Sequence, residues 1–93
     1  MAETDKPRKE AVAIRYDSKE DKAPKVVAKG AGLVAEQILA TAEKHTVPVY
    51  RNRTLTSMLM AVDLDREIPP EMYKAVAEVL AYVYRLDQKR RRR

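Results

Sequence analysis

Hydrophobic and polar positions follow two different periods along this chain. Residues 11–16 alternate between one face of larger apolar side chains and one face of alanines and an arginine, which predicts a partly covered, interior strand. Residues 17–24 are charged and predict a loop, and the valine-rich residues 25–29 predict a second short strand.

The spacing then changes to that of a helix. Apolar residues recur every three or four positions over 31–45, after Gly30 interrupts the second strand. Residues 47–50 predict a third strand, in which Pro48 suits an edge or a start. The second strand, this helix and the third strand would form a βαβ unit, with a right-handed crossover if the two strands are parallel.

Two more helices are predicted in the C-terminal half. Asn52 is a suitable N-cap for a short helix over 53–61, and Pro69 and Pro70 open a last helix that ends near Leu86. The apolar stripe of the short helix is Leu55, Met58, Leu59 and Val62. The apolar band of the last helix is Tyr73, Val76, Ala77, Leu80, Val83 and Tyr84.

These elements predict one small α/β domain, with a mixed sheet of three to four short strands packed with three to four helices. A length of 93 residues suits one domain and not two. We expect a flexible N-terminal segment over 1–10, the folded domain over 11–87 and a basic tail over 88–93.

The net charge of +5 is confined to the tail. Acidic and basic residues balance up to position 87, and the excess lies in Lys89, Arg90, Arg91, Arg92 and Arg93. Such a run can bind RNA, an anionic membrane surface or an acidic partner, or can simply be solvated. It lacks interleaved aromatic residues for base stacking, and the balanced body argues against nucleic acid.

The chain has no cysteine, which excludes disulfides, thiolate metal sites and a cysteine nucleophile. No segment has the roughly 20 apolar residues of a membrane helix, and the polar N-terminus does not resemble a signal peptide. The sequence therefore predicts a soluble cytoplasmic protein.

No pattern indicates catalysis, a cofactor or a metal site. His45 is the single histidine, and its place near a helix end favours a structural role. Gly30 and Gly32 lie between a strand and a helix, as in a phosphate-binding turn, but the third glycine and a Gly-Lys-Ser or Gly-Lys-Thr motif are absent. A turn that needs a flexible backbone is the simpler interpretation.

Four segments in order resemble the cytoplasmic C-terminal domain of FlhB-type export switch proteins. Residues 11–17 and 23–31 resemble AVALRYD and APKVVAKGA, and residues 43–49 and 67–86 resemble EEHGVPIV and EIPxxLYxAVAEVLAYVYRL. The resemblance covers about residues 11–87. It implies a module of the flagellar or type III protein export apparatus.

The resemblance also locates a motif that departs from the family. The family's self-cleavage occurs in Asn-Pro-Thr-His, where the asparagine side chain attacks its own carbonyl. The matching positions here are Lys6, Pro7, Arg8 and Lys9. Lysine has no carboxamide to cyclise, so we expect no self-cleavage and a non-enzymatic protein. Together with Met1, the altered motif favours a natural short protein that mimics the cleaved fragment.

The resemblance further implies a substrate-docking patch at Ala23, Pro24, Ala77 and Leu80. From the residues alone, Ala77 and Leu80 are equally well explained as core positions. The expected partners are export apparatus proteins, export substrates or their chaperones, at the cytoplasmic side of the inner-membrane export gate. The alternative is a small protein that binds RNA or an acidic surface through the arginine tail.

Overall fold

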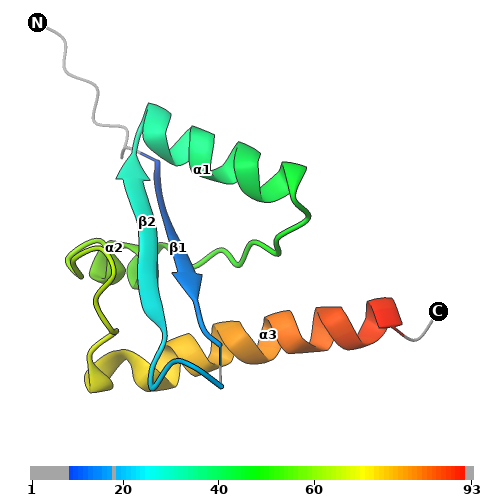
Figure 1. Ribbon diagram of the computed structural model, residues 1–93. Helices are drawn as coiled ribbons and strands as arrows, with labels where there is room; N and C mark the ends of the chain where they lie inside the picture. The colour runs from blue at the N-terminus through cyan, green and yellow to red at the C-terminus, as the bar shows by residue number, and fades with distance from the viewer. Residues whose placement is uncertain (1–8, 18, 92–93) are drawn as a thin grey trace, which may run out of the picture.

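The computed structural model describes residues 9–17 and 19–91 of the chain, apart from the side chains of Arg90 and Arg91. Two strands, three α-helices and one 3-10 turn follow one another along these residues (Figure 1). Their bounds are β1 Glu10–Arg15, β2 Lys25–Ala31, α1 Leu33–Lys44, α2 Arg53–Leu59, η1 Pro70–Met72 and α3 Tyr73–Arg91. The predicted α/β class is confirmed, although the sheet is smaller than expected.

Helices cover both faces of the antiparallel pair β1–β2. The larger apolar side chains Val12 and Ile14 face α2 and α3, where they pack against a core centred on Val26, Ile68 and Val76. The opposite face carries alanines and lies against α1, so the predicted partial cover is confirmed. Among the described strands β1 pairs only with β2, so its predicted interior position was wrong. In Figure 1, α1 follows the end of β2 and runs across the direction of the strands, while α3 crosses the end where β2 begins.

A β-bulge decides which residues of β2 face the core. Ala13 pairs with Ala28 and Ile14 pairs with Val26, so Val27 has no partner across the ladder. Without this extra residue, Val26 and Ala28 would point to the same side of the sheet. The bulge directs Val26 into the core and leaves Ala28 beneath α1.

The bulge also places Lys29 opposite Val12, on the core side of the sheet. From there, Lys29 Nζ donates hydrogen bonds to the backbone oxygens of Met60 (2.8 Å) and Val62 (2.7 Å). These carbonyls follow the C-terminal end of α2, where a cation is favoured by the helix dipole. Lys29 therefore joins the sheet to the end of α2.

The predicted third strand at 47–50 and its βαβ unit were wrong. The segment is irregular, and Pro48 has no N–H to donate to a ladder. Tyr50 instead packs edge-on against Tyr82 of α3, with ring centroids 5.2 Å apart. Since the described strands form a two-stranded antiparallel sheet, the expected mixed sheet of three to four strands was also wrong.

A different segment lies beside the start of β2. Glu67 forms an isolated antiparallel bridge with Lys25. Ile68 N donates to Pro24 O at 2.9 Å, and Asp65 N donates to Val26 O at 2.7 Å. These bonds fix the backbone of Pro24 to the core residue Ile68.

The helix predictions hold with shifted ends. Asn52 is the N-cap of α2, and its side chain accepts a hydrogen bond from Leu55 N at 3.0 Å, as predicted. Met58, expected in the apolar stripe, is exposed. Helix α3 continues to Arg91, so the start of the basic tail extends this helix and does not leave it at Leu86.

Glycine is required at positions 30 and 32 for two different structural reasons. A Cβ on Gly30 would lie 2.6 Å from Val34 Cβ and closer still to its Cγ1, so Gly30 permits the close approach of α1. Gly32 is the N-cap of α1 with φ 63° and ψ −125°, a region that other residues rarely adopt. The interpretation as a turn is confirmed for Gly32. Gly30 instead lies inside β2 and pairs with Ala11, so the predicted interruption of the strand at Gly30 was wrong.

Candidate functional site

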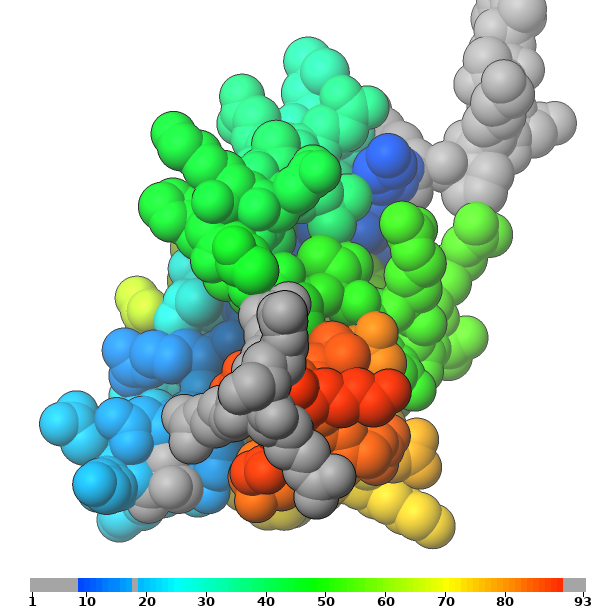
Figure 2. All heavy atoms as spheres, turned by 90° about the vertical axis from the view of Figure 1, so that its right-hand side faces the viewer, coloured from blue at the N-terminus to red at the C-terminus, as the bar shows by residue number. Residues whose placement is uncertain are grey.

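A groove of about 300 Å³ lies between the β1–β2 loop and the first half of α3. All four predicted docking residues, Ala23, Pro24, Ala77 and Leu80, line it. The loop supplies the first two and α3 supplies the others. Figure 2 shows the loop (blue) beside α3 (orange to red) at the base of the molecule.

The groove has a buried floor and an accessible upper part. Ala23 is only 2% exposed and Val76 is fully buried, so both form the base. Ala77 is exposed, and Leu80 is half-buried with its inner side against the core. Ala77 is therefore not a core residue, while Leu80 contributes both to the core and to the groove wall.

The sequence did not single out the residues at the rim. Tyr16 and Tyr73 are 43% and 45% exposed, and Lys22 is exposed as well. Tyr73 lies one helical turn before Ala77, and Lys22 directly precedes Ala23. These sequence positions, close to the predicted docking residues, could have indicated Tyr73 and Lys22 as groove residues. Only the folded loop, however, brings Tyr16 and Lys22 alongside α3.

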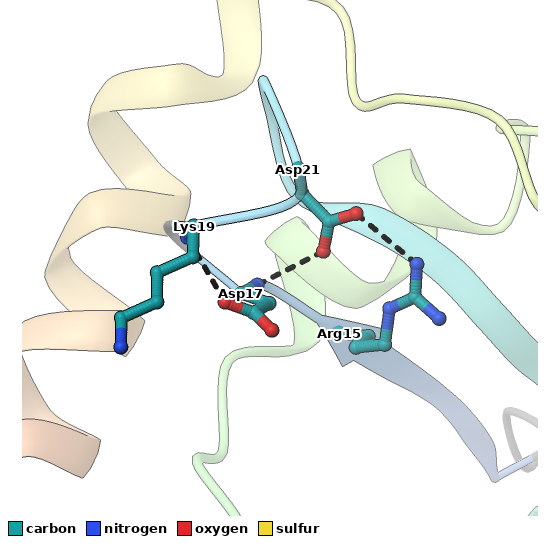
Figure 3. Close-up of polar contacts among 4 residues, drawn as sticks. All are labelled: Arg15, Asp17, Lys19 and Asp21. Carbon is teal, nitrogen blue, oxygen red and sulfur yellow. Dashed lines mark hydrogen bonds and ion pairs between the residues drawn. The ribbon is translucent and has the colours of Figure 1, made fainter.

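The carboxylate of Asp21 organises the loop (Figure 3). Its Oδ1 accepts a hydrogen bond from the Arg15 guanidinium at 3.1 Å, and its Oδ2 accepts one from Asp17 N at 2.9 Å. Asp17 O in turn accepts from Asp21 N at 2.7 Å, and Asp17 Oδ1 accepts from Lys19 N at 2.9 Å. This network closes the turn immediately before Ala23.

The same contacts shift the titration of Asp21. The hydrogen bond from the Asp17 backbone is the main cause that holds the pKa of Asp21 below its ordinary value. Burial acts in the opposite direction, and the charges of Arg15 and Lys25 lower the pKa further. The ionised carboxylate is thus the form that the folded loop favours.

We predict that Asp21→Asn weakens the pH dependence of stability. Because the folded state lowers the pKa, ionised Asp21 stabilises the fold fully above the unfolded value of about 3.9, and this contribution is lost as pH falls through the folded pKa. The difference in unfolding free energy between wild type and variant should be largest near pH 7 and shrink below about pH 4. Urea titrations from pH 7 to pH 3 measure it.

Glu20→Gln is the matched control, since Glu20 is an exposed carboxylate of the same loop. Its curve should follow that of the wild type. A constant offset between wild type and Asp21→Asn at every pH would contradict the predicted linkage.

Other predicted residues lie partly outside the described residues. Lys6, Pro7 and Arg8 of the degenerate motif are outside, whereas Lys9 is exposed and its carbonyl accepts a hydrogen bond from Gly32 N at 2.8 Å. In the tail, Lys89 is exposed on α3, the backbone of Arg90 and Arg91 is helical, and Arg92 and Arg93 are outside.

His45 ends α1 as its C-cap, with its backbone N–H donating to Thr41 O at 3.0 Å. It also borders a second hollow, of about 430 Å³, between α1 and the alanine face of the sheet. The four predicted docking residues do not line this hollow. Within 9–17 and 19–91, His, Cys, Asp and Glu side chains form no group of three suited to a metal ion.

None of the helices in the described part of the chain combines the length and the hydropathy needed to cross a bilayer.

Comparison with known proteins identifies relatives over most of the chain. The family described as FlhB HrpN YscU SpaS matches residues 5–83. The uncharacterized protein YlqH of Bacillus subtilis (strain 168) is 42% identical over 82 residues, which cover 88% of each chain. The flagellar biosynthetic protein FlhB of Aquifex aeolicus (strain VF5) is 49% identical over 74 residues, but these cover 78% of this chain and 21% of that protein.

Solved structures share the same fold. The cytoplasmic domain of FlhB from Shewanella putrefaciens is 37% identical with a TM-score of 0.83, over 89% of this chain and 65% of that one. The PscU C-terminal domain is 31% identical with a TM-score of 0.78, over 82% of this chain and 98% of that one. The chain therefore matches a whole C-terminal domain, while it spans about a fifth of the FlhB proteins it resembles.

Proposed function

The chain belongs to the FlhB HrpN YscU SpaS family, and from this we propose that it is a non-enzymatic module of the flagellar or type III export apparatus. In this role it docks export substrates, chaperones or gate proteins through the groove of Ala23, Pro24, Ala77 and Leu80. It works in the cytoplasm, beside the inner-membrane export gate, and substitutes for the cleaved C-terminal fragment in substrate-specificity switching.

The observation that carries this proposal is the groove itself. Residues distant in sequence come together as an accessible apolar surface next to a fully buried core. A groove of about 300 Å³ has room for one or two side chains of a partner segment and would bind it weakly and reversibly. Rapid exchange suits a site that passes many substrates.

A secretion assay tests the function. Cells whose FlhB lacks its cytoplasmic C-terminal part would receive this chain separately, and early and late export substrates in the medium would be quantified. Restored export of either class supports the proposal, and the class that returns gives the switch state. No export, with the protein folded and abundant, would overturn it.

Ala77→Asp places a carboxylate on the apolar surface and should lower restored export about tenfold or more, because an apolar partner leaves this charge without compensation. Ala81→Asp is the matched control, since Ala81 is exposed one turn further along α3 and does not line the groove. Equal loss in both variants would contradict a role for the groove.

The arginine tail carries the alternative function, which is binding to RNA or to an acidic surface. A chain truncated after Gln88 separates the two in the same assay. Export that survives truncation favours the groove. Export that depends on the tail alone, or RNA binding that is lost with it, would favour the alternative.

We also propose that the chain does not cleave itself. Lys6 occupies the position of the family's asparagine and lacks the carboxamide that would form a succinimide. Purified protein should therefore keep its full mass through incubation at pH 7 to 9, as followed by intact mass spectrometry. A fragment that begins at Pro7 would refute this. Lys6→Asn with Arg8→Thr and Lys9→His recreates Asn-Pro-Thr-His and tests whether the motif alone can restore the reaction.

A further inference from the structure

We propose that the groove selects partner segments that carry a carboxylate beside their apolar anchor, and that Lys22 is the residue that recognises it. This inference rests on the proposed docking function and specifies the chemistry of its partner. The partner is an extended protein segment with one or two large apolar side chains flanked by Asp or Glu.

The apolar part of this partner follows from the groove surface. Ala23 and Val76 form a buried base, and Ala77 and Leu80 form the wall on α3. The small alanines leave the space, and burial of a partner's Leu or Phe side chain there would remove apolar surface from water. Apolar contacts are non-directional, so the orientation of the partner segment in the groove must come from polar groups at the rim.

Lys22 is the one charged residue that lines the groove in the described part of the chain. Arg15 lies in the same region, but its guanidinium is held by Asp21 at 3.1 Å, which is the sole ion pair among the described residues. The charge of Arg15 is thus compensated inside the protein. Lys22 is exposed, and its ammonium stays available to a partner.

Acidic residues within 9–17 and 19–91 do not line the groove. Asp17 and Glu20 in the loop and Glu78 on α3 are exposed, and none of them forms an ion pair with Lys22. The long lysine stem can lie on the apolar surface while its ammonium reaches past the rim. An accessible ion pair of this kind should change affinity by about two- to fivefold and weaken with added salt.

Titration of isotope-labelled full-length chain with three blocked hexapeptides tests the inference by NMR. Each probe has two central leucines, flanked on both sides by glutamate, glutamine or lysine. Chemical-shift changes should centre on the groove, and affinity should fall in the order glutamate, glutamine, lysine. Each probe should bind about two- to fivefold more tightly than the next one in this order at low salt, and the ratio should be smaller at 0.5 M salt.

Charge reversal gives the decisive comparison. Lys22→Glu should reverse the order of the probe affinities, and Lys22→Gln should make the three affinities nearly equal. Lys19→Glu makes the same change in net charge, in the same loop but away from the groove, and should keep the wild-type order.

Probes that bind the groove with equal affinities would overturn the role of Lys22 alone. An equal effect of Lys19→Glu would do the same, because it would indicate net charge and not the site. If no probe binds the groove, the proposed docking function falls, and this inference falls with it.

Discussion

Replacement of Ile68 by alanine is expected to lower the free energy of unfolding by about 2–5 kcal/mol, the usual range for truncation of a buried Ile. Ile68 is 1% exposed and packs in the core with Val26 and Val76. The free energy of unfolding of a whole domain is only about 5–15 kcal/mol, so this single change should remove a large part of it. Urea unfolding followed by circular dichroism measures it.

Leu64→Ala is the control for this change. Leu64 belongs to the same connector but is 52% exposed, so its truncation should cost no more than about 0.5 kcal/mol. Ile68→Val should lie between the two, at about 0.5–1.5 kcal/mol. Equal costs for Ile68→Ala and Leu64→Ala would mean that the connector does not anchor the core.

This prediction also concerns the groove. Ile68 N holds the carbonyl of Pro24, one of the proposed docking residues, at 2.9 Å. A cavity at Ile68 should therefore loosen the loop as well as the core. Amide hydrogen exchange should be faster at Ala23 and Lys25 in Ile68→Ala than in Leu64→Ala, under conditions where both variants remain folded.

Gly30→Ala is expected to destabilise the fold by about 1–3 kcal/mol through steric overlap, the usual cost of overpacking. The new Cβ would lie 2.6 Å from Val34 Cβ and nearer still to Val34 Cγ1, so α1 must shift away from the sheet. Val34→Ala removes Cγ1 and keeps Cβ. The double variant should thus regain part, but not all, of the loss.

Gly32→Ala separates steric overlap from backbone strain. No atom lies within 4 Å of a Cβ built at this position, but its φ of 63° is unfavourable for alanine. The expected cost is about 1–3 kcal/mol, and Val34→Ala should not relieve it. A double-mutant cycle should give a clear coupling for Gly30 with Val34 and almost none for Gly32 with Val34. Equal coupling energies would contradict the assignment of steric overlap to Gly30 and of backbone strain to Gly32.

Several features of the protein were determined by short-range sequence patterns. The alternation of residues 11–16 identified β1 and its small face, and Asn52 and the proline pair marked the starts of α2 and of the last helical segment. These predictions succeeded because they depend on neighbours within one helical turn or one strand. The family resemblance likewise needed only local motifs.

The order of segments beside the sheet depended on tertiary structure. Residues 47–50 have strand-like composition, yet Tyr50 packs on Tyr82, while residues 65–68 pair with the start of β2. Strand pairing is a contact between distant segments, and composition does not reveal which segment reaches an edge. The bulge at Val27 has the same origin, since its register is defined only by pairing with β1.

The groove also depends partly on local sequence and partly on tertiary structure. The sequence placed Ala23, Pro24, Ala77 and Leu80 in a patch by resemblance, but could not tell whether Ala77 was core or surface. Helical periodicity gives the direction of a side chain around α3, not what covers it. The loop that Asp21 closes folds against α3, which buries Ala23, leaves Ala77 exposed and brings Lys22 to the rim. Exposure is a property of the packed chain, so the local sequence did not decide it.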